Sequence, residues 1–206
     1  MTNSDVLGRL GVSRETIDRL KAVELLLAKW NPAINLVSKA SLSDTWVRHI
    51  LDSAQLYRLA PGLINHWVDL GSGGGFSGLI VAIIAAELDP QRRITLVESD
   101  QRKATFLRQA AQSVDLSVTV IADRIERIPP LNADVLSARA LAALPELCGF
   151  ADRHLAQDGL ALFPKGATYK DEIAQAGRSW RFDLTVHPSE TDSSAVILSL
   201  KAIEHV

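Results

Sequence analysis

The chain has 206 residues, of which 47% are hydrophobic, and a formal net charge of −2 at pH 7. This length suffices for one domain of ordinary size with an appendage, and the charge gives no general indication of nucleic-acid binding. A local basic surface would still be enough for such binding. The single cysteine excludes an intramolecular disulfide and a cysteine-rich metal site.

The ends and the apolar stretches of the chain bear on its location. The amino terminus, MTNSDVLGRLGVS, lacks the charged and then apolar pattern of a signal peptide. The longest apolar stretch, Leu79 to Ala86, is too short to cross a bilayer. We therefore expect a cytoplasmic protein without a membrane partner. The histidines are scattered along the chain, so we also expect no metal.

The amino-terminal third has helical spacing of its apolar residues. One helix is expected over residues 13–30, ended by Asn31-Pro32, and a second from about residue 42 to residue 59. Pro61-Gly62 ends the second helix. We predict that residues 1–62 form a helical extension packed on a core domain of residues 63–206.

The rest of the chain alternates between short apolar runs and helical patterns. Strands are expected at 66–70, 93–98, 117–121, 134–138 and 160–163, with helices at 78–88, 102–114, 144–155 and 169–180. Two last strands, 182–187 and 195–201, leave no room for a helix between them. The pattern predicts a doubly wound, Rossmann-like α/β sheet of seven strands, six parallel and one antiparallel at the carboxy terminus.

A glycine-rich loop follows the first expected strand. The stretch from Gly73 to Gly78 fits G-x-G-x-x-G, which is weak evidence by itself. Its context is more informative, because a strand precedes it, a helix follows it, and Glu98 ends the next strand. A carboxylate at that position accepts hydrogen bonds from the ribose hydroxyls of an adenosine. The alternatives are a plain tight turn and an ordinary charged residue at a strand end.

Dinucleotides and S-adenosylmethionine both bind loops of this kind, and Asp69 distinguishes between them. It lies just before Gly71 and Gly73, in the pattern Asp-x-Gly-x-Gly-x-Gly. A carboxylate there would repel a pyrophosphate, whereas the ammonium group of S-adenosylmethionine needs such an acceptor. The pattern therefore favours S-adenosylmethionine.

The segment "IADRIE" after the third expected strand borders the expected adenine pocket. Ile125 is placed to pack on the base, and Glu126 to fix its edge, with Asp123 as a further acidic position. The alternative for Asp123 is a helix N-cap.

The sequence also limits the group that would be methylated. Cys148 lies on the apolar face of an expected helix, so we interpret it as a core residue and not a nucleophile. The loop "LSARALAAL" lacks the Asn/Asp-Pro-Pro-aromatic motif of exocyclic-amine methyltransferases. A ring nitrogen such as N7 of guanine needs no deprotonation, only orientation. Arg139 suits this chemistry as the catalytic residue, because a guanidinium can donate to guanine O6 or to a phosphate; the alternative is a surface ion pair.

Several linked motifs carry a resemblance to a known family. "WNPAINLVSK", "RHILDS", "VDLGSGGGFSGL", "LVESDQRKATFL", "ADRIE", "SARALAAL" and "FPKG" occur in its order and spacing. The chain thus resembles the bacterial RsmG or GidB family, class I methyltransferases that modify guanine N7 in 16S rRNA with S-adenosyl-L-methionine. One departure is Ser77, where the family often has proline; we expect it to cap the following helix instead.

The resemblance implies site residues by position. Cofactor contacts fall at Gly71, Phe76, Glu98, Ile125, Glu126 and Arg139. Candidates for contact with RNA or the target base are Arg139, Lys165 and His49. The partner would be 16S rRNA in the small ribosomal subunit or its precursor, bound by a monomer.

An RNA-binding protein needs a basic surface, and one group of cations is close in sequence. Arg102 and Lys103 lie near Arg92, Arg93 and Arg108. Lys39 and Arg48 would extend this group, although Arg48 and Asp52 have the spacing of a helical ion pair. The modest total charge predicts weak binding to protein-free rRNA.

Three other functions stay open on the sequence alone. An NAD-type oxidoreductase would explain the glycine pattern, but no second mononucleotide-binding half supports it. A small-molecule methyltransferase could use the helical extension as a lid over its substrate. A non-catalytic regulator that merely binds a nucleotide is the third.

Overall fold

The computed structural model describes residues 10–37, 46–62 and 64–206, except for the side chains of Val47 and Arg48. The expected start of the second helix near residue 42 and the basic residue Lys39 lie outside this part of the chain.

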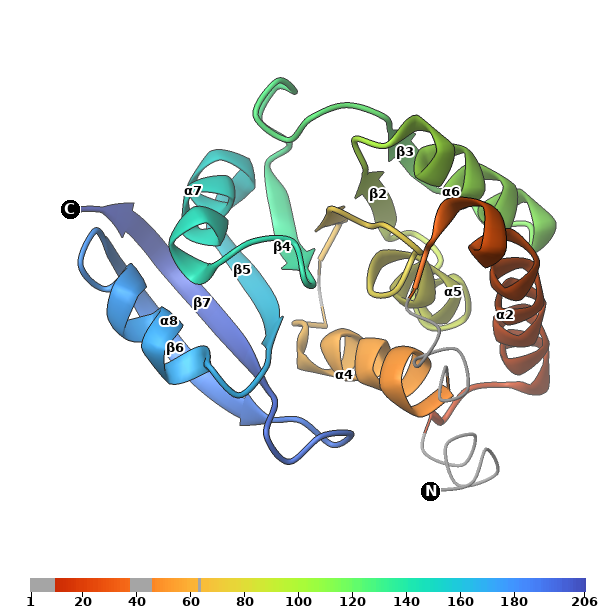
Figure 1. Ribbon diagram of the computed structural model, residues 1–206, viewed down its shortest axis with the longest axis horizontal. Helices are drawn as coiled ribbons and strands as arrows, with labels where there is room; N and C mark the ends of the chain where they lie inside the picture. The colour runs from red at the N-terminus through yellow and green to blue at the C-terminus, as the bar shows by residue number, and fades with distance from the viewer. Residues whose placement is uncertain (1–9, 38–45, 63) are drawn as a thin grey trace.

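One seven-stranded sheet forms the centre of the molecule, in the order β3-β2-β1-β4-β5-β7-β6 (Figure 1). Its strands are β1 (His66–Leu70), β2 (Arg93–Val97), β3 (Thr119–Ile121), β4 (Ala133–Ala138), β5 (Leu155–Lys165), β6 (Trp180–Pro188) and β7 (Val196–His205). Strands β1 to β5 pair in parallel, and β7 pairs antiparallel with both β5 and β6. Six strands therefore run in one direction and β7 in the other, which confirms the predicted sheet.

Helices cover both faces of the sheet, as the alternating sequence pattern predicts. The core of one face contains α5 (Gly78–Leu88) and α6 (Gln101–Ser113), and that of the other contains α7 (Leu144–His154) and α8 (Tyr169–Ala176). Helix α2 (Arg14–Ile34) packs on α5 and α6, while α4 (Asp52–Leu59) packs on α5. A π-helical turn, η1 (Trp46–Leu51), leads into α4.

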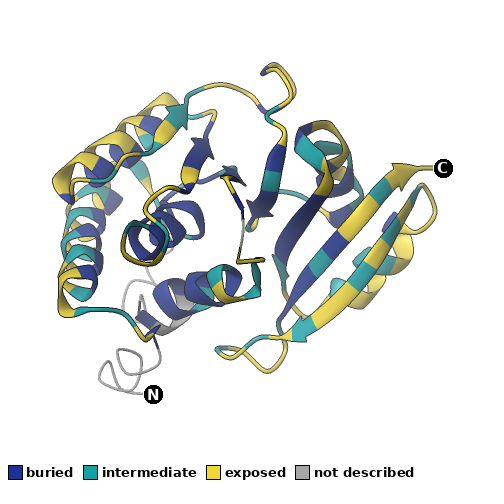
Figure 2. Ribbon diagram, turned by 180° about the vertical axis from the view of Figure 1, so that it is seen from behind, coloured by how far each residue is buried: buried dark blue, intermediate teal, exposed yellow. Residues whose placement is uncertain are grey.

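Burial explains why the central elements have continuous apolar sequences. Every residue of β1 is buried, because parallel strands in this sheet have helices on both faces. Helix α5, GLIVAIIAAEL, lies between the sheet and the amino-terminal helices and is buried from Gly78 to Ala85. Strand β6, at the edge of the sheet, has intermediate and exposed residues in alternation along most of its length (Figure 2).

The first helix runs further than its sequence indicates. Asn31-Pro32 was expected to end it, but α2 continues through Pro32 to Ile34 and ends at Asn35 in a left-handed conformation, with φ of 51°. Pro32 has no backbone N–H to donate to the carbonyl of Ala28, but only Ala33 and Ile34 follow it in the helix, so the disturbance is confined to the end of α2. The backbone N–H of Asn35 donates to the Asn31 carbonyl, and the Asn31 side chain accepts from Val37 N–H at 2.8 Å.

The carboxy-terminal elements also differ from the expected boundaries. Helix α8 ends at Ala176, and Trp180, expected at the end of that helix, begins β6 instead. Trp180 pairs with His205 in the hairpin register, and the two rings meet edge to face with centroids 4.9 Å apart. Long-range pairing thus overrides the local helical pattern and lengthens β5, β6 and β7 beyond the predicted strands.

None of the helices in the described part of the chain combines the length and the apolar character that a membrane span requires.

We expect the Asn31 side chain to make a measurable contribution to the stability of the protein. Asn31→Ala removes the acceptor of the Val37 N–H and should lower the free energy of unfolding by about 1–2 kcal/mol. Chemical denaturation would measure this change, with the exposed Lys29→Ala as the control in the same helix. Equal effects of the two substitutions would contradict the assignment.

Candidate functional site

A cavity of about 570 Å³ lies where the carboxyl ends of β1, β2, β3 and β4 meet. The segments that follow these strands line it: residues 71–74, 97–99, 123–126 and 139–141. The lining is completed by residues from the helical elements, by two residues after α2 and by one from the glycine loop: His49, Lys103, Glu146 and Phe150, then Leu36 and Val37, and Phe76. Ligands of open α/β sheets bind at this position, where the strand order reverses between β1 and β4.

The cavity brings together most of the residues that the sequence singled out. Those that line it are Gly71, Gly73, Phe76, Glu98, Asp123, Ile125, Glu126, Arg139, His49 and Lys103. Asp69, Arg102 and Lys165 are not part of the lining.

The glycine loop approaches the sheet so closely that side chains do not fit. A Cβ at Gly78 would lie 2.4 Å from Leu96 Cδ2 and 2.6 Å from Asp69 Cβ. Gly71 has φ of +64°, and a Cβ there would lie 2.6 Å from Leu141 Cδ1. Glycine is therefore required at both positions, and the loop backbone forms the floor of the cavity.

The carboxylate of Glu98 is fixed by backbone donors. Its Oε2 accepts a hydrogen bond from Gly73 N–H at 2.8 Å, and its Oε1 accepts from Asp100 N–H at 2.8 Å. The residue is buried apart from 8% of its surface. The glycine loop and the end of β2 thus hold one carboxylate at the cavity wall.

Asp69 lies beneath the glycine loop and is only 1% exposed. Its Oδ1 accepts from Ser137 Oγ at 2.6 Å, and Ser137 Oγ itself accepts from Trp67 Nε1 at 2.9 Å. Burial raises the pKa of Asp69 from 3.8 to about 6, although its hydrogen bonds, among them one from Gly78 N–H, act in the opposite direction. The side chain therefore supports the loop from behind, whereas the sequence interpretation placed it against a cofactor.

The segment after β3 forms another part of the wall. Ile125 is 8% exposed and faces the cavity, and its carbonyl accepts from His154 Nε2 at 3.1 Å. Burial lowers the pKa of His154, so the ring is neutral and carries its proton on Nε2. Asp123 is not a helix N-cap, because no helix follows it: residues 125–127 form a turn, and Asp123 Oδ1 accepts from Arg124 N–H.

Arg139 follows β4, lines the cavity and forms an ion pair with a residue outside it. Its Nη2 lies 3.4 Å from Asp52 Oδ2 at the start of α4, and both side chains are mostly buried. The sequence considered a surface ion pair for Arg139 and an Arg48 partner for Asp52. In the structure, Arg139 and Asp52 form an ion pair with each other. The side chain of Arg48 lies outside the described part of the chain.

His49 and Phe76 form a stacked pair at the cavity. Their ring centroids lie 4.2 Å apart with an interplanar angle of 24°. His49 comes from the π-helical turn η1, and Phe76 comes from the glycine loop. Ser53 Oγ donates to the His49 carbonyl and joins this turn to α4.

The basic residues expected to contact RNA have different surroundings. Lys103 lines the cavity, while Arg102 is exposed beside it and lies 3.3 Å from Asp100. Asp100 caps α6 by accepting from the N–H groups of Arg102 and Lys103. The two cations therefore sit on the first turn of α6, one at the cavity and one on the outer surface.

Lys165 is placed differently from the expectation. Its Nζ donates to the Ala142 carbonyl at 2.8 Å and to Glu172 Oε2 at 2.7 Å, and the side chain is 8% exposed. The same Glu172 oxygen accepts from Leu144 N–H at the start of α7. These contacts join β5, α7 and α8, so Lys165 supports the loop after β4 from behind the cavity.

Cys148 is fully buried in α7, as the apolar pattern predicts. Burial raises the pKa of its thiol to about 12, which keeps it protonated at neutral pH.

Sequence reasoning missed two kinds of site residue. The first kind is apolar: Leu36, Val37 and Leu141 lie within the quoted motifs and Phe150 lies outside them, but none has a polar group that would assign it to a site and not to the core. The second kind is Asp52, which was visible in "RHILDS", but its partner Arg139, at the carboxyl end of β4, cannot be found from sequence spacing.

The sheet order, the reversed β7 and the glycine loop define the Rossmann-like fold of methyltransferases. Solved structures share this fold at low sequence identity. One is a TehB-like SAM-dependent methyltransferase from Corynebacterium glutamicum, with a TM-score of 0.58, 14% identity, and coverage of 79% of this chain and 92% of that chain. Another is a ribosomal protein L11 methylase from Lactobacillus delbrueckii, with a TM-score of 0.59, 16% identity, and coverage of 75% and 78%.

The chain belongs to the GidB family, described as rRNA small subunit methyltransferase G, whose model matches residues 16–196. It is 54% identical over 208 residues to the ribosomal RNA small subunit methyltransferase G of Cereibacter sphaeroides, covering 100% of both chains. It is 55% identical over 197 residues to the protein of the same name from a Ruegeria species, covering 96% of both. The resemblance seen in the sequence motifs is confirmed.

The backbone conformation of Ser77 suggests a substitution that would stabilise the loop. It has φ of 112°, and its buried hydroxyl makes no hydrogen bond to the described residues, so the expected helix cap is not formed. Ser77→Gly should raise the free energy of unfolding by about 1 kcal/mol, because glycine adopts this conformation without strain. Ser77→Ala keeps the strain and should gain less; an equal gain would contradict the explanation.

Because Asp69 is buried, we expect the difference in stability between the wild type and an Asp69→Asn variant to depend on pH. Because its folded pKa of about 6 exceeds the value near 3.9 of an unfolded chain, ionisation between pH 4 and 6 destabilises the folded state. The free energy of unfolding of the wild type should therefore fall relative to Asp69→Asn by about 2 kcal/mol between pH 4 and pH 6. Urea titrations at several pH values measure it, and a constant difference would contradict the assignment.

Proposed function

We propose that this protein transfers a methyl group from S-adenosyl-L-methionine to N7 of a guanine in 16S rRNA of the small ribosomal subunit. The observation that carries the proposal is one cavity with a fixed carboxylate, Glu98, on the glycine-loop side and a guanidinium, Arg139, after β4. Membership in the methyltransferase G family supports the same reaction class.

The residues of the cavity fit an adenosyl cofactor. The Glu98 carboxylate would accept from the ribose hydroxyls, and Ile125 would pack on the adenine, with Asp123 and Glu126 at its edge. Gly71, Gly73 and Phe76 would border the amino-acid and sulfonium part. Bound in this way, S-adenosylmethionine supplies an electrophilic methyl group.

The start of α5 argues against a dinucleotide in the same cavity. A pyrophosphate would need the free N–H groups of that helix terminus. Here the buried carboxylate of Asp69 already interacts with Gly78 N–H at this terminus. A second negative group would be repelled, whereas the cofactor proposed here carries no phosphate.

The chain's own residues can promote methyl transfer without taking up a proton. The lone pair of guanine N7 is free at neutral pH, so the protein has only to hold the base in line, which can contribute roughly 7–11 kcal/mol. Arg139 would donate to guanine O6 or a neighbouring phosphate and leave N7 open. Cys148, buried and protonated, would take no part.

The RNA would approach through the mouth of the cavity. Lys103 on the lining and Arg102 beside it would bind phosphates, and the stacked rings of His49 and Phe76 offer an aromatic surface to an unstacked base. Lys165, buried in its pair with Glu172, would act on the RNA only through the loop it supports.

Labelled methyl transfer to purified small subunits tests the proposal. The wild type should modify one guanine at N7, as mass mapping of the rRNA would identify. Arg139→Ala should lower kcat/KM by about 100-fold or more, because a positioning donor is lost, while cofactor affinity measured by calorimetry changes less. The exposed Arg181→Ala on β6 is the charge-matched control. Absence of methylation by the wild type would refute the proposal.

A further inference from the structure

We propose that Asp52, Ser189 and Thr191 form a positioning network that holds the guanidinium of Arg139 in its productive orientation. This inference rests on the function proposed above and adds residues outside the cavity to it. None of the three residues lines the cavity, so each acts through Arg139.

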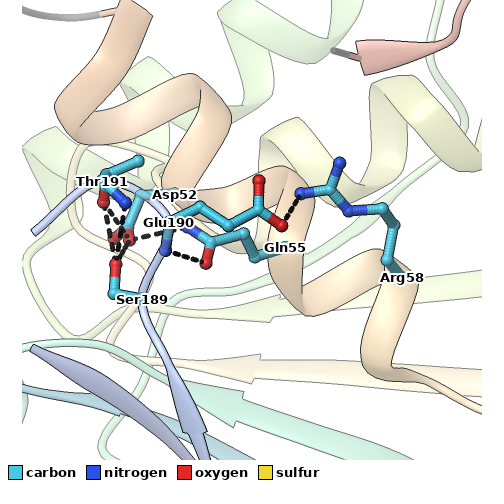
Figure 3. Close-up of polar contacts among 6 residues, drawn as sticks. All are labelled: Asp52, Gln55, Arg58, Ser189, Glu190 and Thr191. Atoms are coloured by element: carbon cyan, nitrogen blue, oxygen red, sulfur yellow. Dashed lines mark hydrogen bonds and ion pairs between the residues drawn. The ribbon is translucent and has the colours of Figure 1, made fainter. Parts of the chain in front are cut away.

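The two carboxylate oxygens of Asp52 contact different partners. Oδ2 lies 3.4 Å from Arg139 Nη2. Oδ1 accepts from Thr191 Oγ1 at 3.0 Å, from Gln55 Nε2 at 3.3 Å and from Ser189 Oγ at 3.5 Å (Figure 3). Because donors fix one oxygen, the other is held toward the arginine.

The loop that supplies these hydroxyls joins β6 to β7 and is docked along α4. Gln55 Oε1 accepts from Glu190 N–H at 2.8 Å, and Arg58 Nη2 lies 2.8 Å from Glu190 Oε1. Residues 52, 55 and 58 are spaced three apart, so one side of the helix meets consecutive residues of the loop (Figure 3). The carboxy-terminal hairpin is thereby fixed to the amino-terminal helices.

The loop is ordered by its own hydrogen bonds before it meets Asp52. Ser189 Oγ and Thr191 Oγ1 lie 2.9 Å apart, and Thr191 N–H donates to Ser189 Oγ at 3.2 Å. Ser189 N–H also donates to the Ala195 carbonyl across the loop. Each hydroxyl has one proton, so when Thr191 Oγ1 donates to Asp52 Oδ1, Ser189 Oγ donates either to Thr191 Oγ1 or, at 3.5 Å, to the same carboxylate oxygen.

This arrangement has a consequence for the rate of methyl transfer. An arginine side chain has many rotamers, and ordering it during the reaction would raise the barrier. A network that orders it in advance removes that cost, and a displacement of about 1 Å can lower a rate on the order of 100-fold. The loop therefore contributes to kcat more than to cofactor binding.

Thr191→Val tests the network because it keeps the shape of the side chain and removes the donor. We expect kcat for labelled methyl transfer to small subunits to fall about fivefold or more, with cofactor Kd unchanged. Thr191→Ser should restore the rate. Glu190→Gln is the matched control, because it disturbs the Arg58 pair of the same loop without altering the bonds to Asp52.

A double-mutant cycle separates positioning from loop stability. In an Arg139→Gln background, followed by single-turnover labelling, Thr191→Val should have no further effect. An equal fold loss in both backgrounds, or an equal loss in Glu190→Gln, would overturn the network. A wild type that methylates no rRNA would instead refute the proposed function, so the two failures are distinguishable.

Discussion

The close contact between the glycine loop and the end of the sheet determines the rest of the site. Gly78 packs against Asp69 and Leu96, where no Cβ fits, and this contact sets where α5 begins. The loop backbone then reaches Glu98, whose carboxylate accepts from Gly73 N–H. A larger residue at Gly78 would push the loop away from β1 and remove the floor of the cavity and the carboxylate together.

The carboxylates at and around the site are buried to different extents. Asp69 is buried beneath the loop, Glu98 is held at the wall, and Asp52 faces Arg139 from α4. Burial raises the pKa of Asp69, the deepest of these carboxylates, and its hydrogen bonds from Ser137 and the loop act in the opposite direction. Three cations, Lys103, Arg124 and Arg139, also line the cavity and would attract an anionic polymer.

The amino-terminal helices and the carboxy-terminal hairpin meet at the contact between α4 and the loop from β6 to β7, although they are the two ends of the described chain. Helix α4 covers α5 and also contacts the loop between β6 and β7. The methyltransferase fold alone supplies the glycine loop and the sheet. The additional helices supply His49 and Asp52, which turn the general cavity into one with an aromatic surface and an oriented arginine.

The sequence by itself determined the strands of the sheet, the glycine loop and the position of Glu98, because these depend on local burial patterns and neighbouring residues. Its errors were the end of α2 at Asn35, the end of α8 near Trp180 and the cap at Ser77, where packing overrides local preference. Only the tertiary structure decided that Lys165 turns to Glu172 and that Asp52 meets Arg139 and Thr191. Asp52 and Thr191 are 139 residues apart, and such contacts follow from how whole elements pack, which no local pattern specifies.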